Sequence, residues 1–232
     1  MTTKYEQISS SLFVKNRKKF TEKMQPKSMA IFNSNDIYPV SSDSTLPFAQ
    51  HRDIFYLSGV DQEESILLIF PDAYKEEHRE ILFLRETNEH IAIWEGEKLT
   101  KEKATEVSGV KSVFWLSDFD RIFYNLMNEA ENIYLNKNEH YRAVLEVQTR
   151  EDRFIERVKK EFPLHEILRS NPILQHLRSV KEPEEIALMQ KACDITEKGI
   201  RRLLNFIKPN VWEYEIEAEL IHEFIKNRSK GF

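Results

Sequence analysis

The chain has 232 residues, of which 41% are hydrophobic and 11% aromatic, so it can bury a sizeable core and form one large domain or two small ones. Its formal net charge of -5 is spread over 34 basic and 39 acidic residues, which excludes a basic field that would bind nucleic acid. The single cysteine excludes an internal disulfide, and no apolar run reaches the length of a membrane span. Because the first residues lack a signal-peptide pattern, we expect a cytoplasmic protein with no nucleic-acid partner and no membrane partner.

The first part of the chain predicts one helix followed by strands. From Tyr5 to Met24 the apolar residues keep a helical rhythm, which stops before Pro26. The next apolar runs are short and bounded by turn residues, which predicts buried strands at 29–33, 65–70 and 80–85.

The middle of the chain predicts further strands and a helix. The segment HIAIW, residues 90–94, alternates and then meets Gly96, as in a strand that ends in a turn. A strand at 112–116, a helix at 118–130 and a strand at 132–136 follow, an order that favours a parallel pair. We therefore expect an α/β fold with a mixed sheet flanked by helices.

After Thr149 the pattern becomes almost entirely helical, with no strand signal. A long amphipathic helix begins at Pro183, and a second one follows Pro209. Both stand at the end of the sequence without further elements to cover their apolar faces. They resemble the beginning of a second domain more than the end of one.

Several motifs that suggest catalysis are more simply structural. The letters His51-Arg52-Asp53 open a protein-kinase catalytic loop, but the required Asn position is Ser58, and neither a D-F-G nor a glycine-rich loop is present. The seven histidines lie apart, and the two H-E-x-x-x segments lack a second histidine, so we expect no metal ligands. Cys193 falls on the apolar face of its helix, where a core residue is more common than a nucleophile.

Two residues are better candidates for ligand contact. Asp43 lies in a polar loop that leads into an aromatic segment, and Trp94 is expected at the end of a strand beside a turn. Polar and aromatic side chains on loops often line clefts. A half-buried Trp at a strand end is equally compatible with a structural role.

Four segments together resemble one family. The segments are SSDSTLPFAQHRDIFYLSGVDQEESILLIF (41–70), IAIWEGEKLT (91–100), LRSVKEPEEIALMQKACDITEKGI (177–200) and KPNVWEYEIEAELIHEF (208–224). They resemble, in the same order, the N-terminal domain and first catalytic-domain helices of Xaa-Pro aminopeptidases, the aminopeptidase P members of the creatinase/prolidase metallopeptidases. In the family pattern Asp53 begins an aromatic, strand-like segment that ends at Gly59, so the kinase-like letters belong to the scaffold.

The resemblance implies a division of the chain and a function for its parent. Residues 1–172 would form the N-terminal α/β domain and 173–232 the helical start of a truncated pita-bread catalytic domain. Family members release the N-terminal residue that precedes a proline, with two metal ions, usually Mn²⁺, that activate a bridging water. Their ligands, two aspartates, a histidine and two glutamates, lie downstream of the helices present here. The chain alone is therefore expected to be inactive, with no catalytic residue and no metal ligand.

The family's N-terminal domain mediates subunit contacts and narrows access to the active site. By this resemblance we expect a homo-oligomer, with Xaa-Pro peptides as substrates of the full-length protein. Trp94, in the I-W-x-G segment, is the first candidate for a substrate-proximal residue and Asp43 the second. The alternative is a non-catalytic protein-binding module with an aminopeptidase-like fold. Coding sequence beyond Phe232 would separate the two, because only an enzyme needs the ordered ligands.

Overall fold

The structure is a computed structural model that describes residues 6–143 and 146–229, apart from the side chain of Glu89. It divides into two compact units. The α/β unit is Ile8–Ser179, and the helical unit is Val180–Phe232 together with Met1–Gln7. The helix Asn171–Ser179 ends where the two units meet and is part of the α/β unit, because its Leu174 is buried in that unit's core. The expected division at residue 172, and the assignment of the second part to a catalytic domain, remain predictions.

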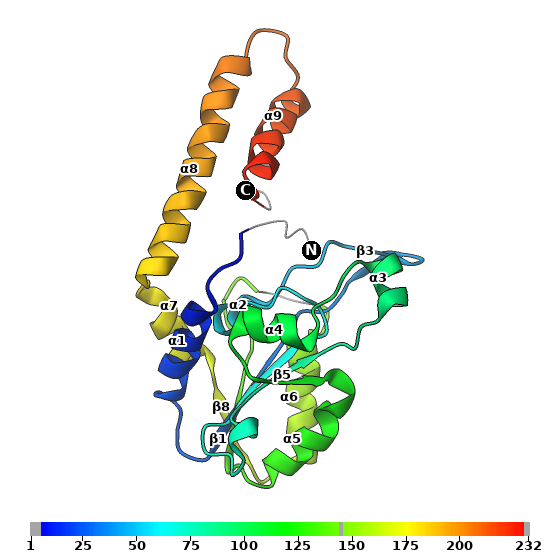
Figure 1. The fold of residues 1–232 in the computed structure, drawn as a ribbon, viewed down its shortest axis with the longest axis vertical. Helices are drawn as coiled ribbons and strands as arrows, with labels where there is room; N and C mark the ends of the chain where they lie inside the picture. The colour runs from blue at the N-terminus through cyan, green and yellow to red at the C-terminus, as the bar shows by residue number, and fades with distance from the viewer. Residues whose placement is uncertain (1–5, 144–145, 230–232) are drawn as a thin grey trace. The chain divides into compact units, whose positions relative to one another are not determined.

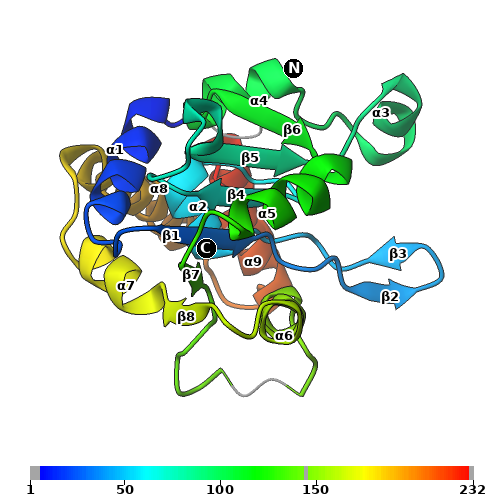
Figure 2. The ribbon, with the colours of Figure 1, turned by 90° about the horizontal axis from the view of Figure 1, so that it is seen from below.

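The α/β unit contains a six-stranded mixed sheet in the order β6-β5-β4-β1-β7-β8 (Figure 2). The strands are β1 (Ser28–Asn33), β4 (Ile66–Ile69), β5 (Glu80–Leu84), β6 (Ser112–Trp115), β7 (Asn132–Leu135) and β8 (Glu166–Arg169). β1 and β4 are buried along their whole length, as expected for central strands that carry continuous apolar runs. This confirms the predicted α/β fold with a mixed sheet.

Helices cover both faces of the sheet. In chain order the helices of the α/β unit are α1 (Ser10–Thr21), α2 (Arg52–Ser58), α3 (Glu89–Glu95), α4 (Lys101–Ser108), α5 (Phe119–Met127), α6 (Arg150–Glu161) and α7 (Asn171–Ser179), with short 3-10 helices η1 (Glu76–His78) and η2 (Leu116–Asp118). The helices α8 (Pro183–Phe206) and α9 (Glu213–Lys226) belong to the helical unit. A two-stranded hairpin of β2 (Pro39–Ser41) and β3 (Ser44–Thr45) projects from the unit (Figure 2).

Each face of the sheet has its own core because neighbouring residues of a strand point to opposite sides. On one face, Ile31 and Phe83 pack with aromatic residues of α5 and α6 such as Phe123. On the other face, Phe32 and Leu82 pack with residues of α1, α2, α4 and α7. The sheet is therefore buried on both sides.

The segment 90–94 is a helix, and the prediction of a strand there was wrong. Asn88 caps the helix, since its side chain accepts a hydrogen bond from the Ile91 nitrogen at 2.9 Å. Gly96 ends it with a positive φ of 81°. Ile93 and Trp94 are strongly exposed, so the apolar side chains of the segment are not buried in the sheet. The alternation of polar and apolar residues was outweighed by the cap.

Two further expectations fail locally. Residues 52–58 form α2, although the family pattern suggested a strand-like segment; the His51 side chain caps it and Gly59, with φ 69°, ends it. The second failure is β8, since no strand was expected after Thr149. Its pattern is weak because it lies at the sheet edge beside β7 and is only half-buried.

The helical unit contains α8 and α9, which lie side by side. At Gly199 the two helices approach closely, because an added Cβ there would lie 2.7 Å from Leu220 Cδ1. Arg202 of α8 and Glu219 of α9 form an ion pair at 2.5 Å. Cys193, expected in a core, is exposed. No helix in the described part of the chain is both long enough and apolar enough to cross a membrane.

Candidate functional site

The carboxyl ends of most strands meet at one edge of the sheet. β4 is antiparallel to β1 and β5, whereas β6 is parallel to β5, β7 to β1 and β8 to β7. All strands except β4 therefore run in one direction, and the segments that follow them leave at the same edge. Ligands of open α/β sheets bind outside the carboxyl ends of the strands. We call this the carboxyl edge and treat it as the candidate functional site.

Asp43 lies at the tip of the β2–β3 hairpin, in the segment that follows β1. It is exposed, and the preceding Ser42 has a positive φ of 50° that forms the tight turn. The hairpin exposes several large apolar side chains, which is unusual for a short solvated ribbon. They are Ile37, Tyr38, Val40 and Leu46.

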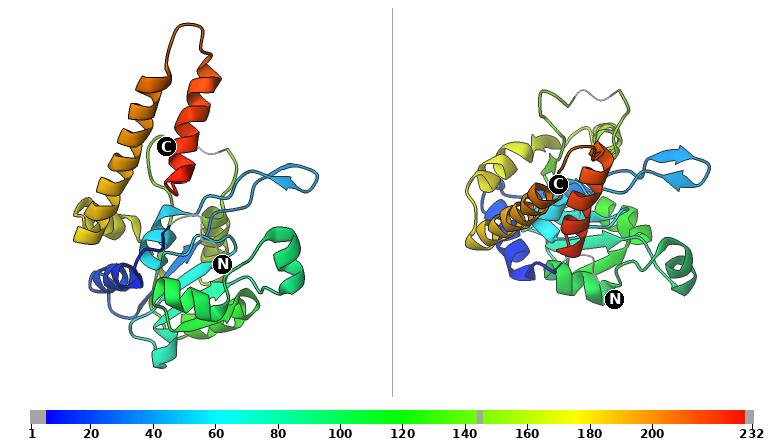
Figure 3. Two further views of the ribbon diagram at one scale, coloured as in Figure 1. Left: turned by 45° about the horizontal axis from the view of Figure 1, so that its top comes forward. Right: turned by 90° about the horizontal axis from the view of Figure 1, so that it is seen from above.

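Trp94 lies on α3, in the segment that follows β5, and its side chain is 78% exposed. Arg85, just after β5, holds α3 in place, because its guanidinium donates to both carboxylate oxygens of Glu95, at 2.7 and 2.9 Å. The hairpin and α3 project from the same side of the α/β unit in all views (Figures 1, 2 and 3). The two predicted residues thus occupy separate projections from one edge, and neither is enclosed in a pocket.

A buried carboxyl group lies beneath this edge. Glu151, in the first turn of α6, accepts hydrogen bonds from the Asn33 backbone nitrogen at 3.1 Å and from Asn33 Nδ2 at 2.9 Å. Burial raises the pKa of Glu151 to about 8, against the effect of the two hydrogen bonds and of Arg150. Glu151 is therefore largely protonated at neutral pH.

The kinase-like letters take part in a polar network that fixes α2 and α7. Asp53 accepts hydrogen bonds from Asn136 Nδ2 at 3.1 Å and from Arg178 Nη1 at 2.7 Å. His51 Nδ1 accepts from the Asp53 backbone nitrogen at 3.3 Å, and burial lowers the pKa of His51. Each carboxylate oxygen of Asp53 thus accepts a hydrogen bond within the fold. This supports the interpretation of His51-Arg52-Asp53 as scaffold.

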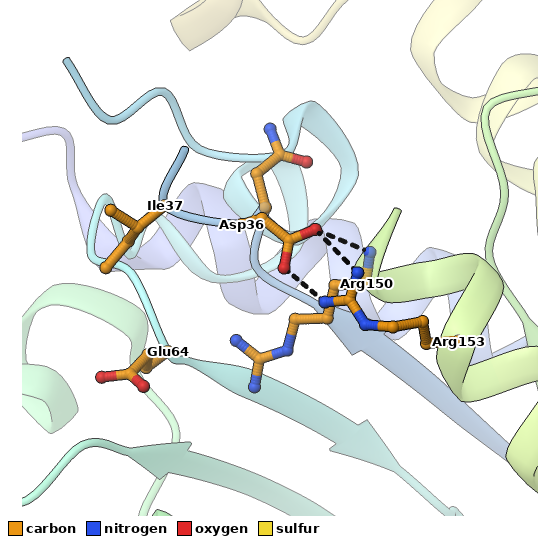
Figure 4. A pocket seen from close by; sticks show the side chains of 6 residues that line it. Asp36, Ile37, Glu64, Arg150 and Arg153 are labelled. Carbon is orange, nitrogen blue, oxygen red and sulfur yellow. Dashed lines mark hydrogen bonds and ion pairs between the residues drawn. The ribbon is translucent and has the colours of Figure 1, made fainter. Parts of the chain in front are cut away.

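An open hollow of about 320 Å³ also lies at the carboxyl edge (Figure 4). Its lining comes from the segment after β1, the loop before β4 and the start of α6: Asn35, Asp36, Ile37, Glu64, Arg150 and Arg153. Asp36 joins two of these segments, because it pairs with Arg153 at 2.5 Å and accepts from the Arg150 backbone nitrogen at 2.9 Å. The carboxylate thus offsets the positive end of the α6 dipole.

Sequence reasoning missed the residues of this hollow and the buried Glu151. The capping box formed by Thr149 and Asp152 was a usable signal for the start of α6. Nothing in the local sequence showed that the first turn of α6 would contact the end of β1. No group of three or more His, Cys, Asp or Glu side chains able to hold a metal occurs among the described residues.

Comparisons with known proteins identify the family. The family model described as aminopeptidase P, N-terminal domain, matches residues 13–134. The Xaa-Pro aminopeptidase of Escherichia coli K12 is 27% identical over 225 residues, which cover 97% of this chain and 51% of that protein. The chain thus spans about half the length of the curated relatives that it matches.

Solved structures agree in fold. One is a Bacillus anthracis protein provisionally assigned as an aminopeptidase P. It has a TM-score of 0.85 and 24% identity, and the match covers 94% of this chain and 52% of that one. Zinc-substituted E. coli aminopeptidase P in complex with product has a TM-score of 0.78 and 27% identity, over 95% of this chain and 50% of that one. Together with the matched family model, these likenesses confirm the resemblance first seen in the sequence. The chain belongs to the aminopeptidase P N-terminal domain family.

Proposed function

We propose that this chain is the N-terminal portion of a metal-dependent Xaa-Pro aminopeptidase, which releases the residue that precedes a proline. The observation that carries the proposal is the alignment of 97% of the chain with 51% of the E. coli Xaa-Pro aminopeptidase. The family resemblance assigns the catalytic ligands to the half of the protein that this chain does not cover. The chain then supplies subunit contacts and control of access, and the other half supplies the chemistry.

The carboxyl edge is the part of the chain that we assign to this role. Exposed apolar side chains on the β2–β3 hairpin and on α3 suit contact with another protein surface. We assign that surface to a neighbouring subunit of a homo-oligomer, where Trp94 and Asp43 would approach the bound peptide. The exposure of Trp94 is consistent with this assignment, because covering an exposed indole with a partner surface is favourable in free energy.

The metal belongs to the parent protein in this proposal. The described residues of this chain bring together no set of ligands that fits a divalent cation. One E. coli relative is zinc-substituted, and we propose two Mn²⁺ ions in the native parent. Bound metal would supply an activated water and polarise the peptide carbonyl. No residue of this chain is assigned to that step.

The helical unit is proposed to be the opening of the catalytic domain. α8 and α9 carry large apolar side chains that remain exposed, and these would be covered by the rest of that domain. Among them are Met189, Leu204, Ile207 and Ile225. Their exposure supports the proposal because an unpartnered apolar face of this kind is uncommon on a folded unit.

The experiment that tests the function is a calorimetric titration of Mn²⁺ into this chain, with the full-length gene product as control. The same two proteins are then assayed for release of the first residue from an Xaa-Pro peptide. We expect metal binding and activity for the full-length protein alone. Tight binding or activity in the 232-residue chain would contradict the assignment of its residues to a non-catalytic part. A full-length protein without activity would favour a binding module.

A further inference from the structure

Two opposite charges face one hollow of the α/β unit without touching each other. Arg150 lies at the start of α6, and Glu64 lies just before β4 (Figure 4). Glu64 is the charged group that acts most strongly on Arg150, where it opposes the lowering of the pKa by burial. The ion pair of Glu64 in the described residues is nevertheless made with Arg85, at 3.2 Å. Arg150 and Glu64 thus line the same hollow and form no ion pair with each other in the described part of the chain.

In the part of the chain that the structure describes, most N–H donors of the Arg150 guanidinium have no acceptor. Its Nη1 donates to Ser34 Oγ at 2.9 Å, and the described part of the chain gives it no ion pair. Asp36 does not neutralise it, because that carboxylate is held by Arg153 and by the Arg150 backbone nitrogen. Among the described residues, no carboxylate is therefore bound directly to the Arg150 guanidinium that lines the hollow.

Glu64 carries the matching negative charge. It shares the single guanidinium of Arg85 with Glu95, which holds Arg85 through two hydrogen bonds. Two carboxylates on one guanidinium leave a net charge of minus one. Glu64 also has a positive φ of 51°, a backbone conformation that costs free energy in a residue other than glycine and often occurs at ligand sites.

We propose that the hollow binds a free α-amino acid, with the ligand carboxylate on Arg150 and the ligand ammonium group on Glu64. A carboxylate and a guanidinium form two parallel charge-assisted hydrogen bonds, and the ammonium group supplies a second cation for Glu64, which shares Arg85 with Glu95. Ile37 provides an apolar wall for the ligand side chain. The volume of about 320 Å³ is at the lower end of the range for small-molecule sites, about 300–1,000 Å³. This site is separate from the peptidase chemistry and does not depend on it.

The test is a titration of the 232-residue chain with L-leucine, followed by NMR shifts of the backbone amides. Acetate and methylammonium are titrated in parallel, because each carries only one of the two charged groups. We expect saturable shifts at Ile37, Glu64 and Arg150 with L-leucine, and about tenfold weaker binding of either single-charge probe.

Three variants complete the test. Arg150→Gln and Glu64→Gln remove one charge each, and both should weaken L-leucine binding by about tenfold or more. Arg121→Gln is the matched control, because Arg121 is exposed and does not line the hollow. Glu64→Gln should fold normally, because the Glu64 side chain is 41% exposed, and it therefore tests the site even if Arg150→Gln does not fold. Absence of saturable shifts, acetate binding as tight as that of L-leucine, or equal binding by Glu64→Gln would each overturn the proposal.

Discussion

Glu151 of α6 accepts both of its hydrogen bonds from one residue, Asn33 at the end of β1, through the backbone nitrogen and the side-chain Nδ2. The two residues lie 118 positions apart in the sequence. A carboxyl group with raised pKa thereby connects the first turn of α6 to the central strand of the sheet. The contact makes the stability of the α/β unit depend on pH.

The first prediction concerns the pH dependence of unfolding. The folded pKa of Glu151, about 8, lies above the ordinary value of 4.5. The folded protein therefore binds the proton more tightly than the unfolded chain does. The resulting stability is fully present below about pH 4.5 and is lost as the pH rises to about 8.

Glu151→Gln keeps the side chain neutral at every pH and should abolish this loss. Relative to the wild type, its free energy of unfolding should improve by on the order of 3 kcal/mol between pH 5 and pH 9, as measured by urea denaturation. The matched control is Glu156→Gln on the same helix, where the side chain is exposed. Parallel pH profiles for wild type and Glu151→Gln would contradict the prediction.

The second prediction concerns Arg17, which is fully buried in α1. Its guanidinium pairs with Glu80 at 2.8 Å and donates to the carbonyl oxygens of Leu57 and Ser108, at the ends of α2 and α4. Arg17→Met would leave both carbonyl groups without their donor and should lower the free energy of unfolding by about 3–5 kcal/mol. Arg121→Met removes an exposed ion pair and should cost less than about 1 kcal/mol. Equal losses in the two variants would refute the structural role of Arg17.

The third prediction concerns two glycines with positive φ and different surroundings. Gly59 has φ 69° and ψ 4°, in the left-handed helical region, whereas Gly96 has φ 81° and ψ 167°, a conformation found almost only in glycine. A Cβ at position 59 would lie 2.2 Å from the ring of Phe13, whereas a Cβ at position 96 would meet nothing within 4 Å. Gly59→Ala should therefore cost about 2–4 kcal/mol, because overpacking against Phe13 adds to the backbone strain. Gly96→Ala should cost about 1–3 kcal/mol from backbone strain alone. Thermal unfolding measures both losses, and an unchanged Tm for Gly59→Ala would contradict the prediction.

The fourth prediction concerns Trp94 and follows from the proposed function of the full-length protein. In that protein, Trp94→Ala should lower kcat/KM for an Xaa-Pro peptide by about tenfold, because the proposal places this exposed indole near the bound peptide. Metal content and Tm should stay unchanged. Tyr74→Ala is the control, since Tyr74 is 85% exposed and follows β4, at the opposite edge of the sheet. Unchanged kinetics in Trp94→Ala would remove this residue from the site.

The sequence by itself determined most elements of the fold and the family. Apolar runs such as those of β1 and β4, and the helical periods of α5 and α8, are properties of neighbouring residues and can be read locally. The family segments were recognisable for the same reason. The prediction from local sequence was wrong where two weak patterns disagreed. At α3 an alternating pattern predicted a strand, but the segment is a helix capped by Asn88.

Only the tertiary structure decided the chemistry of the carboxyl edge. The raised pKa of Glu151 depends on its burial, and the hollow depends on the approach of the start of α6 to the loop before β4. Burial and electrostatic environment are set by residues that lie far apart in the chain. Hydrophobic period and capping act within a few residues, so they fix the elements but not which side chains the folded sheet brings together.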